Sequence, residues 1–147
     1  MICRLKEAPI YIIGQYIVVD EPACYVPKYG KGFNYRLANL KEYEKKKQEG
    51  LIETAFDFDN FFNPDLTLFL PFEKNKKNHD AIVQSLLYEI GTKWKERLAI
   101  LFPENKYTIV QYYDSDNSEW YLDFYNGSRV MGDFEAEERI QNIVCIS

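Results

Sequence analysis

Tyrosine and carboxylate side chains gather in the segment 107–125, where their types and spacing suit protein binding. Two runs rich in Tyr, Ile, Val, Trp and Phe flank the turn-prone residues 114–117, which predicts a β-hairpin. If the turn spans 114–118, Tyr113 lies opposite Glu119 and one face gathers tyrosines among carboxylates. Tyrosine offers a large, rigid contact area with a polar end. The candidate partner-binding residues are therefore Tyr107, Tyr113, Glu119, Tyr121, Asp123 and Tyr125.

Two alternatives bear on this surface. A two-residue turn at Asp116-Asn117 would shift the first strand by one residue and exchange its two faces, while the second strand keeps its alternation. In the other alternative, the segment 53–65 or the C-terminus covers the face, since half-buried tyrosines are common in ordinary cores. Which of these side chains are exposed to solvent therefore depends on the register of the hairpin and on whether another segment covers the face.

Cationic side chains define a second candidate site, for an anion. Lys28, Lys31 and Arg36 alternate with aromatic residues in the segment 25–36. Aromatic rings that stack on bases, beside cations that meet phosphates, are typical of single-strand nucleic-acid binding. The alternative is a packed loop whose lysines reach solvent.

Arg97 is a further candidate for anion binding. It falls inside the apolar arc of a predicted helix, where a charged side chain needs a polar partner. In one interpretation its guanidinium points into a pocket as an anion ligand. In the other it pairs with a carboxylate such as Asp57, Asp59 or Asp123.

Nucleophilic and metal-ligating residues do not define a catalytic or metal site. His79 is the only histidine, and Cys3, Cys24 and Cys145 lack the spacing of a zinc site or a disulfide framework. The turn 114–118 resembles the opening of a calcium loop but lacks its glycine and bidentate glutamate. We therefore expect no metal and no cofactor, and the cysteine usage favours a reducing cytoplasmic location.

Charge is distributed unevenly along the 147 residues, which carry a net charge of −5. Residues 1–50 have nine basic and six acidic side chains, whereas residues 106–147 have three basic and eight acidic ones. Such an acidic balance disfavours nucleic acid as a partner and favours a basic protein. Aromatic residues make up 16% of the chain, more than one small core obviously needs.

Hydrophobic periodicity places these residues on a few elements. The strongest signal is an amphipathic helix at about 79–102, with Asn78 as its N-cap and Pro103 beyond its end. A mostly polar helix is predicted at about 40–49, and a loop at 53–65. The predicted strands are 10–19, 66–72, 106–113, 118–125, 128–131 and 140–146, with a helical turn or acidic loop at 133–139.

These elements predict a single α+β domain over residues 1–147. An antiparallel or mixed sheet packs against the long amphipathic helix, and the helix at 40–49 lies on the surface as a minor element. The apolar run 10–19 is about half the length that spans a bilayer, and no cleavage site follows it. We therefore expect neither a membrane segment nor a leader.

The absence of a catalytic motif and the acidic C-terminal third favour a non-enzymatic protein-binding domain. We expect its acidic, tyrosine-rich sheet face to bind a basic partner, and a bacterial immunity protein that inhibits a toxin is one concrete form. The alternative is a small-molecule-binding or enzymatic domain with a pocket between the long helix and the sheet, near Arg97, Tyr112 and Trp120. An exposed aromatic face would also suit a homodimer interface.

Overall fold

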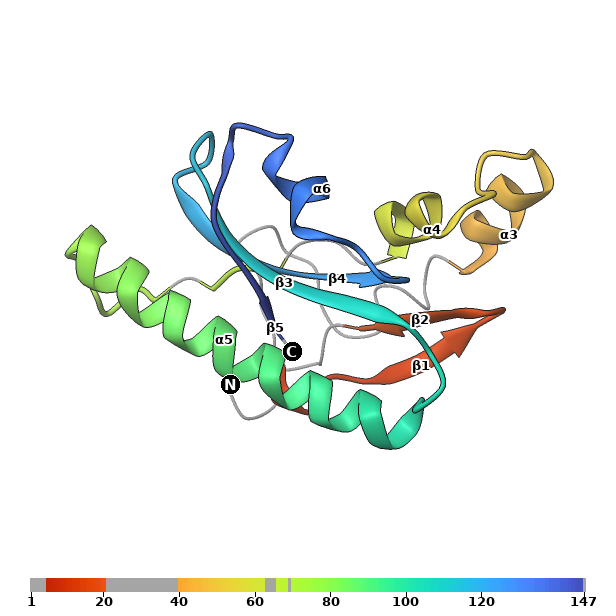
Figure 1. Ribbon diagram of the computed structural model, residues 1–147, viewed down its shortest axis with the longest axis horizontal. Helices are drawn as coiled ribbons and strands as arrows, with labels where there is room; N and C mark the ends of the chain where they lie inside the picture. The colour runs from red at the N-terminus through yellow and green to blue at the C-terminus, as the bar shows by residue number, and fades with distance from the viewer. Residues whose placement is uncertain (1–4, 21–39, 63–65, 69, 147) are drawn as a thin grey trace.

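The computed structural model describes residues 5–20, 40–62, 66–68 and 70–146 and has the α+β architecture that the sequence predicts (Figure 1). Among these residues, no helix combines the length and the apolar composition needed to cross a membrane. The helices and strands are β1 (Ile10–Ile13), β2 (Tyr16–Val19), α3 (Leu40–Gln48), α4 (Ala55–Phe62), α5 (Lys76–Leu101), β3 (Tyr107–Asp114), β4 (Glu119–Asn126), α6 (Met131–Glu135) and β5 (Ile140–Ile146).

The N-terminal apolar run folds as a hairpin rather than as one strand. β1 and β2 pair antiparallel, with Ile13 opposite Tyr16, and the two residues between them form the turn. Gly14 begins this turn with φ of 62°, a left-handed value that glycine adopts without a steric penalty. The prediction of one continuous strand over 10–19 is therefore wrong, because its one glycine marks a turn.

The second sheet has the strand order β4-β3-β5, and both of its pairings are antiparallel. The predicted strands 106–113 and 118–125 are each confirmed to within one residue, and the predicted strand 140–146 matches β5. β3 is buried along most of its length because it pairs on both sides. Helix α5 lies against one face of this sheet and α6 against the other (Figure 1).

Helix α5 confirms the predicted amphipathic helix but begins three residues earlier than expected. Its N-cap is Asn75, whose side-chain oxygen accepts a hydrogen bond from the Asn78 N–H at 3.1 Å. The helix ends at Leu101, before Pro103. Its buried face consists of Val83, Leu87, Ile90, Gly91, Trp94 and Leu98, whereas Ile82 and Ile100, at one margin of the predicted arc, are exposed.

Gly91 allows α5 to approach the sheet closely. A Cβ atom at this position would collide with Ile146 Cδ1 and would lie 3.0 Å from Leu122 Cδ1. Because these side chains come from β5 and β4, the helix crosses the sheet with Gly91 as its point of closest contact.

The segment after the predicted surface helix is helical as well. Helix α3 confirms the prediction at 40–49, but α4 occupies most of the predicted loop 53–65. Thr54 Oγ1 accepts from the Asp57 N–H at 3.2 Å, and Asp57 Oδ2 accepts from the Thr54 N–H at 3.1 Å. This reciprocal capping box starts α4, and Phe58 and Phe62 then bury their rings against Tyr43 of α3.

Two predicted strands are not formed. Leu66 makes only an isolated bridge with Leu122, so the prediction of a strand at 66–72 is wrong for the described residues. Residues 128–130 are not in a strand, and α6 begins at Met131. Helix α6 confirms a helical turn within the segment 133–139, although it starts two residues earlier.

One buried polar cluster joins the two sheets. The Asn126 side chain accepts from the Ile17 N–H at 2.7 Å and donates to the Ile17 carbonyl at 2.9 Å. Asp59 of α4 accepts two further hydrogen bonds from Asn126, one from its N–H and one from its side-chain amide. The Asn126 amide pairs with the N–H and the C=O of Ile17, as the main chain of a neighbouring strand would. Asn126 therefore connects β4 to the edge of β2.

Candidate functional site

The hairpin of β3 and β4 differs by one residue from the first register that the sequence predicts. Asp114, rather than Tyr113, lies opposite Glu119. Asp114 Oδ1 accepts a hydrogen bond from the Asp116 N–H at 2.9 Å, which stabilises the turn Ser115–Ser118. The first prediction is therefore wrong, and the alternative register, in which the first strand exchanges its faces, is confirmed.

This exchange divides the six predicted contact residues between the two sides of the sheet. Tyr107 and Tyr113 lie on the face that α5 covers, where their rings pack against Phe124 and Trp120. Burial there raises the pKa of Tyr107. The other four alternate along β4 on the opposite face: Glu119, Tyr121, Asp123 and Tyr125.

The opposite face is partly covered by the C-terminal segment. Phe134 of α6 packs against Tyr112 and Tyr121, together with side chains of β5. Tyr121 is 5% exposed and Asp123 is 2% exposed. The expectation of an open face is therefore wrong for these two residues, because α6 returns over the sheet. Glu119 and Tyr125 are half-buried at the margin.

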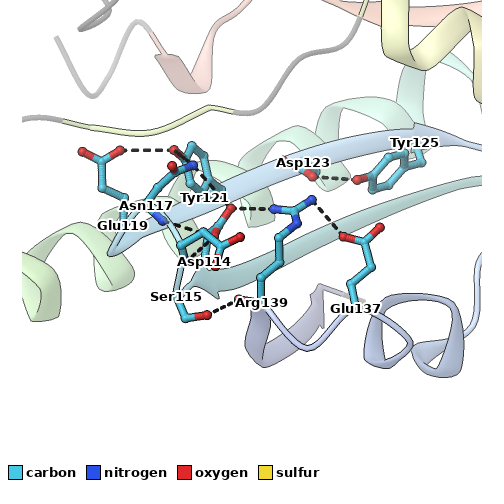
Figure 2. Close-up of polar contacts among 10 residues, drawn as sticks. Asp114, Ser115, Asn117, Glu119, Tyr121, Asp123, Tyr125, Glu137 and Arg139 are labelled. Atoms are coloured by element: carbon cyan, nitrogen blue, oxygen red, sulfur yellow. Dashed lines mark hydrogen bonds and ion pairs between the residues drawn. The ribbon is translucent and has the colours of Figure 1, made fainter.

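Arg139 fastens the C-terminal segment to the hairpin turn (Figure 2). Its guanidinium forms an ion pair with the buried Asp114, and its second terminal nitrogen lies 2.9 Å from Glu137 Oε2. The Arg139 carbonyl accepts from the Ser115 N–H at 2.8 Å. Burial lowers the pKa of Arg139, but the two carboxylates raise it more, so the pKa lies above its ordinary value and the charge is retained.

The tyrosine hydroxyls on this face bond to neighbouring carboxylates. Tyr125 donates to Asp123 Oδ2 at 2.6 Å, and Tyr121 donates to Glu119 Oε2 at 3.2 Å. Figure 2 shows both pairs along β4, with Asn117 donating to the Tyr121 hydroxyl. These bonds fix the orientation of the rings, so the face is rigid before any partner arrives.

A polar pocket of about 350 Å³ lies between this face and α6. Arg129 stacks on the Tyr125 ring at 4.4 Å from its centroid, and one of its nitrogens lies 3.9 Å from Asp59 Oδ2. Each arginine of the pocket is thus already near a carboxylate. The lining residues are Phe56, Asn60, Tyr112, Asp123, Tyr125, Arg129, Asp133, Phe134, Glu137, Arg139 and Ile140.

Beyond the pocket, the molecule presents exposed carboxylates. We call the turn 115–118 and the segment 131–139 the acidic end. The Ser115–Arg139 bond holds its two parts together. Asp116, Glu135 and Glu138 are exposed there and form no ion pair with any described residue. The acidic end therefore exposes negative charge on a rigid support.

Arg97 has a different partner from those predicted. Its Nη1 donates to the main-chain oxygen of Lys6 at 2.9 Å. Burial lowers the pKa of Arg97, and the nearby Glu7 opposes this shift. The prediction that Arg97 pairs with a carboxylate is wrong for Asp57, Asp59 and Asp123, which bond to the α4 N-terminus, Asn126 and Tyr125, respectively. Anion binding by Arg97 stays a prediction.

The predicted anion site of the segment 25–36 is not tested by the structure. Lys28, Lys31 and Arg36 lie outside the described residues. The expected pocket between the long helix and the sheet is not lined by the predicted pair, because Tyr112 faces α6 and Trp120 is packed in the core. Among the described residues, no group of three or more His, Cys, Asp and Glu side chains is placed to hold a metal ion.

Sequence reasoning missed the Asp59–Asn126 cluster. It named Asp59 only as a partner of Arg97 and gave Asn126 no role in a site. The capping pattern from Thr54 to Asp57 was a usable signal for α4, which would have placed Asp59 on a helix. No local pattern connects Asn126 with Ile17, which lies 109 residues earlier in the chain.

Comparison of the chain with protein-family models, with curated proteins and with solved structures found no match. The function is therefore inferred from the geometry and charge of the acidic end and of the sheet face that supports it.

Proposed function

We propose that the chain is a protein-binding domain whose acidic end binds a basic partner. The observation that carries this proposal is the group of three exposed carboxylates, Asp116, Glu135 and Glu138, that no described cation neutralises. An inhibitor of a toxin with a basic active site, of the immunity type, is one concrete form. This proposal keeps the acidic hairpin region but moves the contact surface from the centre of β4 to the turn and the segment 131–139.

Charge favours a cationic partner over an anionic one at this end. The acidic end carries Asp116, Asp133, Glu135, Glu137 and Glu138 against a single cation, Arg139, whose guanidinium already lies between Asp114 and Glu137. Exposed charges of one sign steer an oppositely charged partner and speed its association. Because the Debye length is about 8 Å at physiological ionic strength, this attraction acts mainly near contact.

The buried residues of the sheet face support the acidic end. Tyr121 and Asp123 lie beneath α6, where their bonds to Glu119 and Tyr125 fix the margin of the face. Phe134 anchors α6 on the same rings. A surface that is ordered before binding loses less conformational entropy on association, so it binds more tightly for the same contacts.

A peptide array tests this function. The full chain is applied to 15-residue peptides rich in Lys and Arg, and to matched peptides with Asp and Glu. We expect binding to the basic peptides, weakened at least tenfold by the triple charge reversal Asp116→Lys, Glu135→Lys and Glu138→Lys. All three side chains are exposed, so the fold should be retained.

The matched control is Glu44→Lys, Glu49→Lys and Glu104→Lys, which changes the net charge equally at exposed positions outside the acidic end. We expect this control to keep most of the binding. Equal losses in both triple variants would show that net charge alone attracts the peptides, and the proposed surface would be rejected. An absence of binding to basic peptides would also reject it.

A further inference from the structure

A groove separates the N-terminal half of α5 from the edge of the three-stranded sheet. It has a volume of about 440 Å³ and lies on the opposite side of the sheet from the acidic end. Its lining residues on α5 end at Tyr88, about one turn before the close contact at Gly91. Its lining residues are Ala81, Gln84, Ser85 and Tyr88 of α5, Gln111 of β3 and Val144 of β5.

The floor of the groove contains a polar side chain with an unused acceptor. Gln111 is 1% exposed, and its Nε2 donates to the Gln84 main-chain oxygen at 3.0 Å. Its Oε1 is buried and accepts no hydrogen bond. Rotating the amide would bring Oε1 against the Gln84 oxygen, which is also an acceptor, so the observed orientation is the favourable one. Buried acceptors are nearly always paired, and this one lacks a donor.

One wall of the groove is an open sheet edge. β5 pairs with β3 on one side only, and within the described chain no strand pairs with its outer edge. Figure 1 shows β5 in front of β3, with no labelled strand on its outer side. The N–H and C=O groups along such an edge can pair with an added strand. Because Gln111 lies opposite Val144, both side chains point to the α5 face, beside the groove.

The remaining wall is low and uncharged. Ala81 and Ser85 are one helical turn apart and leave space above the helix, while Tyr88 and Val144, 49% and 38% exposed, stand at the rim. None of the six lining residues carries a charge. A charged segment would lose hydration here without a partner, whereas an uncharged one would not.

We propose that this groove binds an extended, uncharged peptide segment of a partner protein, which adds as a strand to the edge of β5. Its main chain pairs with β5, and one side chain points between Tyr88 and Val144. That side chain carries an amide or hydroxyl donor, which reaches Gln111 Oε1 when the two exposed rim side chains rotate. A second copy of this chain is the competing occupant, because Gln141 of β5, opposite Tyr113, also carries an amide donor on the α5 face.

Two heptapeptides test the proposal on the full chain. Both alternate Val and Ala, which have no side-chain donor; one has Asn and the other has Leu at the central position. Backbone amide NMR signals are followed while each peptide is added. We expect the Asn peptide to shift the signals of residues 81–88 and 143–146, and to bind about tenfold more tightly than the Leu peptide.

A pair of variants on one helix makes the test specific. Ala81→Trp fills the groove, whereas Ala99→Trp places the same ring at an exposed position of α5 outside it. We expect binding to be lost in the first variant and kept in the second. Equal affinity for the Asn and Leu peptides, or no shifts at 143–146 with either one, would overturn the proposal. A concentration-dependent change at 143–146 without peptide would show a second copy instead and would also overturn it.

Discussion

Asn126 links the two sheets through its side-chain amide, which acts both as a hydrogen-bond acceptor and as a donor. Its amide uses both a donor and the acceptor on the main chain of Ile17, and its second donor reaches Asp59 at 2.7 Å. Asp59 is 1% exposed, so its carboxylate depends on these donors and on Arg129 nearby. One residue therefore connects β2, α4 and β4.

Replacing this amide should be strongly destabilising. We expect Asn126→Ala to reduce the free energy of unfolding by about 3 kcal/mol, since it leaves buried polar groups of Ile17 and Asp59 with fewer partners. Urea denaturation measures this change. The control Asn78→Ala removes an exposed amide and should change stability by less than about 0.5 kcal/mol. Similar losses in both variants would contradict the structural role of Asn126.

At the residue scale, contacts between residues close in the sequence could be predicted, whereas contacts between residues far apart in the sequence could not. The turn-prone residues 114–117 do lie at the hairpin turn, where Asp114 Oδ1 accepts from the Asp116 N–H. The carboxylate partner of Arg97 was predicted wrongly, because its guanidinium bonds to the Lys6 main chain instead. Which carboxylate meets which cation depends on how elements pack, and a single sequence contains no direct record of that.

Helix α4 begins at a capping box, and the stability that this capping box contributes depends on pH. Hydrogen bonds from the N–H groups of Glu53 and Thr54, and the Thr54 side chain, lower the pKa of Asp57 below its ordinary value of 3.8. A depressed carboxylate pKa contributes stability above the unfolded-state pKa. That contribution is lost as the pH falls through the lower, folded-state value.

We expect a carboxyl NMR titration to place the pKa of Asp57 below 3.8 in the native chain. Thr54→Ala removes one of the bonds that lower it, so the pKa should move back towards its ordinary value. The same variant should be less stable by about 1 kcal/mol in urea, as for loss of other helix N-caps. A pKa at or above 3.8 in the native chain would contradict the capping box.

The packing of α5 on the sheet depends on the missing side chain at Gly91. Alanine there gains helix propensity of about 1 kcal/mol, but its Cβ collides with Ile146 and lies 3.3 Å from Ile109 Cγ2. Overpacking of this kind costs about 1–3 kcal/mol, so we expect Gly91→Ala to lower the melting temperature. Ile146→Val removes the colliding Cδ1 atom and should reduce the cost in the double variant.

Gly132 is the matched control, since a Cβ atom there meets no atom within 4 Å. Gly132→Ala in α6 should leave stability unchanged or raise it by about 0.5 kcal/mol. If Gly91→Ala were as well tolerated as Gly132→Ala, the close approach of α5 to the sheet would be refuted.

At the element scale, the sequence predicted long periodic elements well and short ones poorly. Helix α5 and strand β5 match their predicted ranges closely, because each presents a consistent apolar pattern. The hairpin 10–19 was read as one strand because its two-residue turn hardly interrupts the apolar run. A register shift of one residue in β3 was enough to move Tyr107 and Tyr113 to the α5 face.

At the scale of the whole molecule, two clusters of rings in the described residues explain part of the excess of aromatic residues. The rings of Phe58, Phe62 and Tyr43 bury the N-terminal hairpin against α3 and α4, and those of Tyr112, Tyr121 and Phe134 join α6 to the sheet. The acidity of residues 106–147 is exposed mainly around this second cluster. Composition predicted an acidic region with many rings, but the burial of its centre depends on α6, whose position over the sheet could not be read from the sequence.

Hydrogen exchange of the full chain, alone and with the tightest-binding basic peptide of the array, tests the central claim most directly. We predict slower exchange at residues 115–119 and 131–139 in the complex, with no change in α3. Protection of α3 or of the α5 groove, with the acidic end unchanged, would contradict the assignment of this end as the partner-binding surface.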